Sequence, residues 1–87
     1  MDTDESKPKD DIRELIIGQL QMIEAVHGVH FVNRDSIIGK IAQVANDRMQ
    51  VSIITAALNG WVAINNLHNE IDIHDEVLTM LLTRTRR

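Results

Sequence analysis

The side chains best suited to chemistry are four histidines, whose ring nitrogens bind metal ions and transfer protons. They are His27, His30, His68 and His74. His27 and His30 are close enough in sequence to meet at one helix end, and Asp72, His74 and Asp75 could add ligands. The spacing matches no zinc motif, and the chain contains neither cysteine nor a His-Glu-x-x-His sequence. We therefore expect no metal site.

Nucleophilic catalysis needs a serine, threonine or cysteine held against a base and an orienting group. The serines are Ser6, Ser36 and Ser52, and none lies in a Gly-x-Ser-x-Gly sequence. The glycines are too far apart to form a phosphate-binding loop. The chain is therefore predicted to be no enzyme, with no cofactor and no small-molecule substrate.

The composition is typical of one small globular domain. The chain has 87 residues, of which 44% are hydrophobic and 25% charged, and its formal net charge is -4. Acidic residues and Pro8 crowd the start, so we expect a disordered acidic lead over residues 1–9 and one helical domain over 10–87. An acidic chain binds nucleic acid poorly through charge alone, but specific binding through one neutral face stays open.

The cellular location is predicted from what the sequence lacks. There is no cysteine, and the acidic start has neither the basic residues nor the apolar stretch of a signal peptide. The longest apolar stretch, 51–64, is too short and too polar to span a bilayer. We expect a cytoplasmic protein without a membrane partner.

The first helix is predicted over 12–27. Asp11 and Glu14 have the spacing of a capping box, and Gly28 suits the position that ends a helix with a positive φ. Its apolar face is too broad for a simple stripe, which indicates burial on more than one side. The second side would contact either another subunit or the rest of the same monomer. For the first case, the predicted dimer interface is Ile12, Ile16, Gln19, Ile23 and Val26.

Three further helices follow from the apolar spacing. Residues 29–32 are expected to be extended, and Asn33 is expected to cap a helix over 34–46 that buries Ile37, Ile38, Ile41, Ala42 and Ala45. A helix over 49–59 would bury Val51, Ile54 and Leu58 and stop at Asn59-Gly60. The last helix begins near Asp72 or Asp75, with an apolar face made of Ile73, Val77, Leu78, Leu81 and Leu82.

Residues 61–74 admit two interpretations. As helix, the chain is a mainly α protein, a compact bundle of about four short helices that forms a dimer. As a hairpin, the order of elements is that of a winged helix-turn-helix, with 50–59 as the recognition helix. The residues that would then face DNA are Arg48, Gln50, Ser52, Thr55 and Asn59.

One segment resembles a known family. Ile17-Gly18-Gln19, then Gly28 after eight residues, then Val32-Asn33-Arg34 and Ile37-Ile38 are similar to the core of the AriR/YmgB family of small enterobacterial regulators of biofilm formation and acid resistance. The resemblance covers about a third of the chain. It implies a short helical protein that dimerises and acts as a connector or transcriptional regulator, and it implies no catalytic residue.

Together these observations predict a non-enzymatic regulatory protein that acts by protein–protein binding, as a homodimer. A DNA-binding transcriptional regulator of the winged helix-turn-helix type is the alternative.

The predicted core of the first helix is testable. Ile16→Asp and Ile23→Asp should each destabilise the domain severely, because each would bury an unpaired charge. Thermal melts followed by circular dichroism measure the loss. Unchanged melting of both variants would mean that this helix is misassigned.

Overall fold

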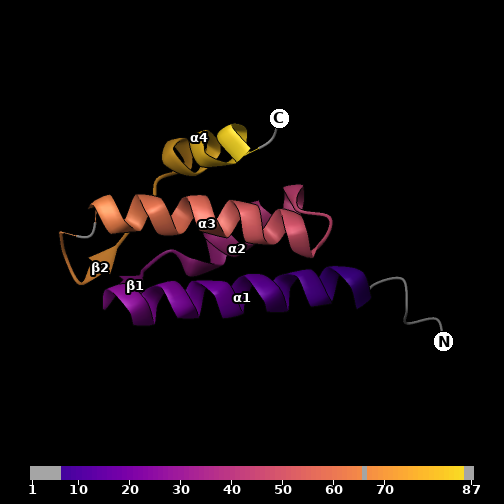
Figure 1. Ribbon diagram of the computed structural model, residues 1–87, viewed down its shortest axis with the longest axis horizontal. Coiled ribbons are helices and arrows are strands. Elements are labelled where there is room, and N and C mark those ends of the chain that lie inside the picture. The colour runs from indigo at the N-terminus through magenta and orange to yellow at the C-terminus, as the bar shows by residue number, and fades with distance from the viewer. Residues whose placement is uncertain (1–6, 66, 86–87) are drawn as a thin grey trace.

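The computed structural model describes residues 7–65 and 67–85, which form four helices and two short strands. The helices are α1 (Lys7–His27), α2 (Arg34–Val44), α3 (Arg48–Asn65) and α4 (Asp75–Thr85), and the strands are β1 (His30–Phe31) and β2 (Glu70–Ile71) (Figure 1). This architecture confirms the predicted mainly α bundle of four helices.

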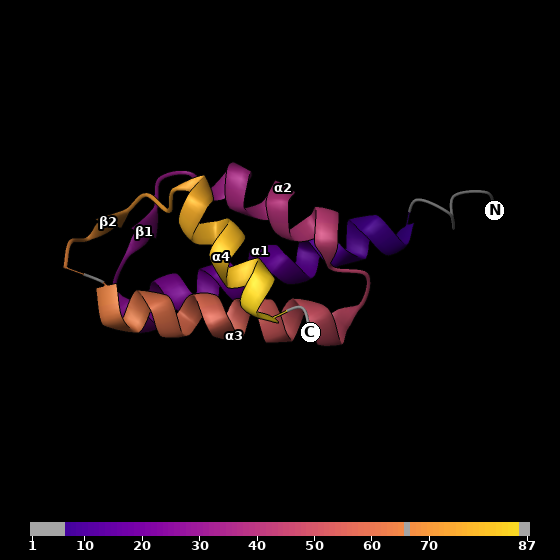
Figure 2. The same ribbon diagram turned by 90° about the horizontal axis from the view of Figure 1, so that it is seen from above.

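The helix α1 lies beside α3, and the two run in the same direction (Figure 1). The helix α2 returns in the opposite direction and packs on α1, while α4 crosses above α3 and α2 (Figure 2). The strands join the two halves of the chain at one end of the bundle. They pair in parallel, with His30 opposite Glu70 and Phe31 opposite Ile71.

The core is aliphatic and is centred on α1. Ile12, Ile16, Leu20 and Ile23 of this helix are all buried, at spacings of three and four residues that place them on one face. The predicted buried face of α2 is confirmed in full. Of the apolar face predicted for the last helix, Ile73, Leu78, Leu81 and Leu82 are buried and Val77 is half-buried. Burying each such side chain favours folding by about 1.5–3 kcal/mol.

The start of α1 differs from the prediction. The helix begins at Lys7, so Asp11 lies within it and is not the residue that caps it. Pro8 is compatible with this start, because amides in the first helical turn have no carbonyl acceptor within the helix. Residues 7–9 are therefore helical rather than part of a disordered lead, and residues 1–6 lie outside the described residues. The predicted end is confirmed, since Gly28 has a φ of 67°.

The prediction that α3 stops at Asn59-Gly60 is wrong. The helix continues to Asn65, because Leu58 and Val62 on either side of this pair are both fully buried against the core. Their packing outweighs the cost of a helical glycine, which is about 1 kcal/mol. In the described part of 61–74, which omits Asn66, there is no hairpin, and β2 pairs with β1 instead. The winged helix-turn-helix alternative is thereby contradicted.

Asn33 takes the predicted position before α2 but serves a different purpose. Its side chain makes no capping hydrogen bond to the helix. Instead, its amide nitrogen donates to the carbonyl of Ile73 at 2.7 Å, and its amide oxygen accepts from the backbone N–H of Ile73 at 3.2 Å. This two-way pairing imitates one more step of the strand ladder and fixes the approach to α4.

Substitution of Asn33 separates the two roles. Serine is a good helix cap but is too short to pair with both backbone groups of Ile73. We expect Asn33→Ser to cost about as much as Asn33→Ala, about 1–3 kcal/mol of unfolding free energy in urea titrations. Full stability of the serine variant would show that capping is the role that matters.

Candidate interaction surface

The predicted dimer face of α1 lies mostly inside the monomer. Ile12, Ile16 and Ile23 are 6%, 0% and 4% exposed because α2 and α3 of the same chain cover them. Gln19 is half-buried, and only Val26 is open to solvent, at 69%. The interface prediction for this set is therefore corrected. The apolar face of α1 is broad because α1 is the central helix of one monomer, which is the second of the two interpretations given for this helix.

The helix that leaves an apolar face uncovered is α3. No charged residue occurs from Met49 to Asn65, although about half of this stretch is exposed. Its outer side carries Met49, Ile53, Ala56, Gly60 and Ile64, all exposed, and we call these five residues the α3 stripe. Their spacing of three and four residues places them within an arc of about 80°. Ordinary solvated helix faces carry charges, and this one carries none.

A shallow hollow of about 200 Å³ runs between α3 and α1 beside the stripe. On the α1 side it is lined by Met22 and Val26, which are 58% and 69% exposed. On the α3 side it is lined by Ser52, Ala56 and Asn59, among others. The stripe and this hollow together form a continuous uncharged surface across the two parallel helices.

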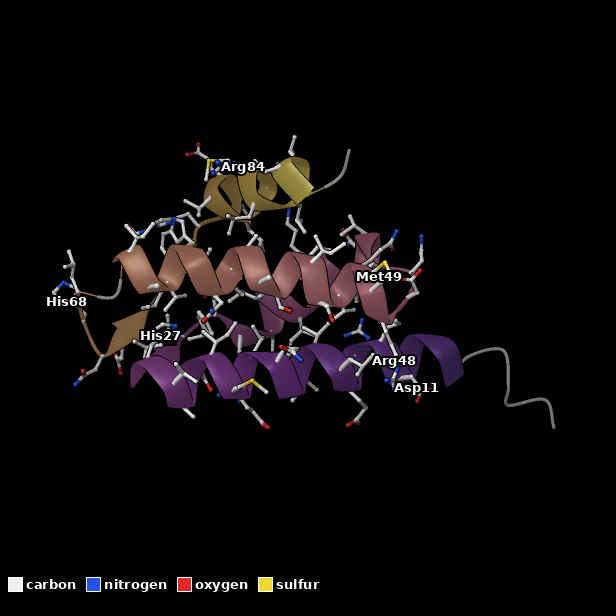
Figure 3. The ribbon with its side chains drawn as sticks, in the orientation of Figure 1. Asp11, His27, Arg48, Met49, His68 and Arg84 are labelled. Carbon is white, nitrogen blue, oxygen red and sulfur yellow. The ribbon has the colours of Figure 1, made fainter. Side chains whose placement is uncertain are left out.

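Charged residues lie at one end of this surface. Asp11 and Arg48 project at the end where α1 and α3 begin, and His27 lies near the other (Figure 3). The backbone N–H of Gln50 donates to the Asp47 side chain at 2.9 Å, and the Gln50 side chain accepts from the N–H of Asn46 at 2.5 Å. These bonds satisfy amides at the start of α3 and hold that end in place.

The residues predicted to face DNA do not form one recognition surface. Thr55 is only 2% exposed, and its hydroxyl donates to the carbonyl of Val51 at 2.8 Å, so that prediction is wrong. Gln50 is engaged in the helix start, and Asn59 is hydrogen-bonded to Nε2 of His27 at 2.7 Å. Arg48 and Ser52 are exposed.

A polar cluster that the sequence did not predict surrounds Glu24, whose side chain is 13% exposed. Its carboxylate accepts from the backbone N–H of Phe31 at 2.9 Å and from Nη2 of Arg34 at 2.7 Å and 3.0 Å. Nδ1 of His30 lies 3.5 Å away. One side chain thus ties α1 to β1 and to the start of α2. The only sequence signal was that Glu24, an acidic residue near the end of the first helix, is followed closely in sequence by His30 and Arg34.

The charge of Glu24 is favoured in the folded state. Burial raises the pKa of Glu24, but the hydrogen bonds from Phe31 and Arg34, with the charges of Arg34 and His30, lower it by more. The net pKa therefore lies below its ordinary value. Because the unfolded chain takes up the proton first as the pH falls, this carboxylate stabilises the fold above its ordinary pKa and ceases to do so below the folded-state pKa.

The histidines do not converge. His27 and His68 point to different places, and His27 is hydrogen-bonded to Asn59 (Figure 3). Within residues 7–65 and 67–85, no group of three or more histidine, aspartate or glutamate side chains is placed to hold a metal ion. The helices described here include none with the length and hydropathy needed to cross a bilayer.

Glu24→Gln should test the cluster by its pH dependence. We expect the variant to be less stable by about 1–2 kcal/mol at neutral pH, because the charged acceptor is lost. The difference should shrink as the pH falls below the ordinary glutamate pKa, and it should vanish below the lowered pKa of folded Glu24, where the wild-type carboxylate itself becomes protonated. Glu14→Gln, an exposed glutamate of the same helix, is the control. A stability difference that does not change with pH would contradict this role.

Comparisons of the chain with protein-family models, with characterised proteins and with solved structures give no match. The resemblance to the AriR/YmgB regulators therefore stays a prediction from the residues that carry it. In the structure those residues run from the middle of α1, through β1, to the first turns of α2.

Proposed function

We propose that this chain is a non-enzymatic regulatory protein that works by binding protein, and that it binds a second copy of itself through the α3 stripe. The observation that carries the proposal is the combination of exposure and absence of charge along α3 from Met49 to Asn65. Three large apolar side chains of the stripe, Met49, Ile53 and Ile64, are 71%, 45% and 80% exposed.

The exposed apolar area of the stripe favours binding. Each Å² of apolar surface removed from water contributes about 25 cal/mol, so an exposed stripe of this kind is a source of binding free energy. The centres of protein interfaces are depleted of charged residues and enriched in methionine. The stripe has both properties, and Met22 and Val26 extend it across the hollow onto α1.

The scaffold beneath the stripe supports the same proposal. The opposite side of α3 is anchored by Val51, Leu58 and Val62, which are at most 2% exposed. The outer side chains therefore stand on a helix whose position is set by the core, so binding costs little ordering of the backbone. A domain of this size also buries a modest fraction of its surface alone, and association adds to it.

Ala56→Arg tests the proposal at the middle of the stripe. Ala56 is exposed, so the change should leave the unfolding free energy within about 0.5 kcal/mol of wild type. In a dimer it would bury a charge, so we expect the dissociation constant to rise at least about 30-fold. Sedimentation velocity over about 1 to 300 μM measures self-association, and thermal melts verify the fold.

Thr79→Arg adds the same charge to an exposed position on α4 and is the matched control. It should associate like the wild type. A wild-type chain that stays monomeric over the whole concentration range would refute self-association. A dimer that Ala56→Arg leaves intact would refute the α3 stripe as its site.

A further inference from the structure

Asn59-Gly60 is the one Asn-Gly pair in the sequence, and it lies within α3. In a flexible chain, an asparagine followed by glycine is especially prone to deamidation, because glycine has no side chain to hinder attack by its own backbone nitrogen. Both residues are exposed, so solvent water reaches the pair. The pair therefore combines a reactive sequence with access to the water that the reaction consumes.

The reaction needs no enzyme and no cofactor. The backbone nitrogen of Gly60 attacks Cγ of Asn59, the new N–Cγ bond closes a succinimide ring, and the Cγ–Nδ2 bond breaks. Nδ2 leaves as ammonia and takes the hydrogen that the Gly60 nitrogen gives up. Water then opens the ring at either carbonyl and leaves aspartate or isoaspartate, whose backbone passes through Cγ. Nothing is oxidised or reduced, and water is the only co-reactant.

The helical backbone of α3 opposes the first step. In the helix, the N–H of Gly60 points along the axis and donates to the carbonyl four residues earlier, that of Ala56. The Cβ of Asn59 is tilted toward the helix N-terminus, away from the Gly60 nitrogen. Leu58 and Val62, 1% and 0% exposed, anchor the helix on either side of the pair. Attack therefore requires the backbone here to leave the helical conformation.

A second contact holds the Asn59 side chain. Nε2 of His27, near the end of α1, lies 2.7 Å from Oδ1 of Asn59. An amide oxygen only accepts, so Nε2 carries the hydrogen and donates it. The side chain is thus tied to a different helix, 32 residues away in sequence. A rotation that brings Cγ to the Gly60 nitrogen must break this bond.

We propose that Asn59 is a site of spontaneous deamidation, which the folded chain suppresses through α3 and the His27 contact and which reacts when this part of α3 opens. The inference concerns one chain and does not depend on the proposed self-association. The product adds a negative charge at residue 59, on a helix that carries no charged residue from Met49 to Asn65. Accumulated product therefore records how much of the time α3 has been open.

Mass spectrometry of the full chain, incubated at neutral pH and then digested, tests the site. Tandem spectra assign the replacement of NH2 by OH to Asn59 rather than to another asparagine. In samples dilute enough to sediment as monomers, we expect the native chain to react at least about tenfold more slowly than the chain in guanidinium chloride, because only the open fraction reacts. Equal rates, or no reaction of Asn59 in denaturant, would overturn the proposal.

Val62→Ala separates the opening of α3 from the chemistry of the pair. Val62 is fully buried, so its truncation should let α3 open more often and raise the native rate at least about fivefold, with no change in denaturant. Val32→Ala, the same truncation at an exposed valine outside α3, is the control and should react like the wild type. A native rate that Val62→Ala leaves unchanged would contradict control by α3.

His27→Ala removes the contact to the Asn59 side chain. We expect the native rate to rise about threefold, because one hydrogen bond no longer opposes the reaction, and the rate in denaturant to stay the same. His68→Ala is the control, because His68 is exposed and lies apart from His27 (Figure 3). Equal native rates of His27→Ala and the wild type would refute the part assigned to His27.

Gly60→Ala tests the chemical route. A Cβ at this position meets no atom within 4 Å, so the fold should be kept. In denaturant, where the helix no longer matters, we expect deamidation of Asn59 to slow at least about fivefold, because the added methyl group hinders the attacking nitrogen. An unchanged rate in denaturant would show that the Gly60 nitrogen is not the attacking group.

Discussion

The burial of one aliphatic stripe on α1 is the constraint from which the arrangement of the other helices follows. Ile16 and Leu20 are completely enclosed, and Ile12 and Ile23 are nearly so. Two helices are needed to cover such a face, so α2 and α3 both lie along α1. Because one side of α3 packs against α1 and another packs against α4, its third side is exposed to solvent.

Polar side chains fix how the chain enters and leaves these helices. Glu24 holds β1 and the start of α2 against α1, and Asn33 pairs with the backbone just before α4. Both act through half-buried hydrogen bonds that join different elements of the fold, where an unpaired partner is costly. They compensate for strands that are only two residues long and would contribute little order by themselves.

The outer side of α3 is exposed and apolar, and it carries no charged residue from Met49 to Asn65. A core residue such as Val62 is explained by what it packs on, whereas Gly60 and Ile64 contact little of their own fold. The proposed association between copies would give Ile64 an apolar neighbour. Regulation through such a surface requires no catalytic group.

Local residue patterns determined the number of helices, most of their core faces, the turn at Gly28 and the start of the last helix to within Asp72 or Asp75, of which the structure has Asp75. These features depend on spacing and on backbone preferences, which neighbouring residues carry. Only the tertiary structure decided that α3 runs through Asn59-Gly60, that Thr55 is buried, and that Asn33 bonds to Ile73 rather than to its own helix. It also decided that the broad face of α1 is covered from within the chain, which moves the candidate interface from α1 to α3. Each of these outcomes depends on which distant segment lies alongside, and packing against that segment outweighs a local preference of about 1 kcal/mol.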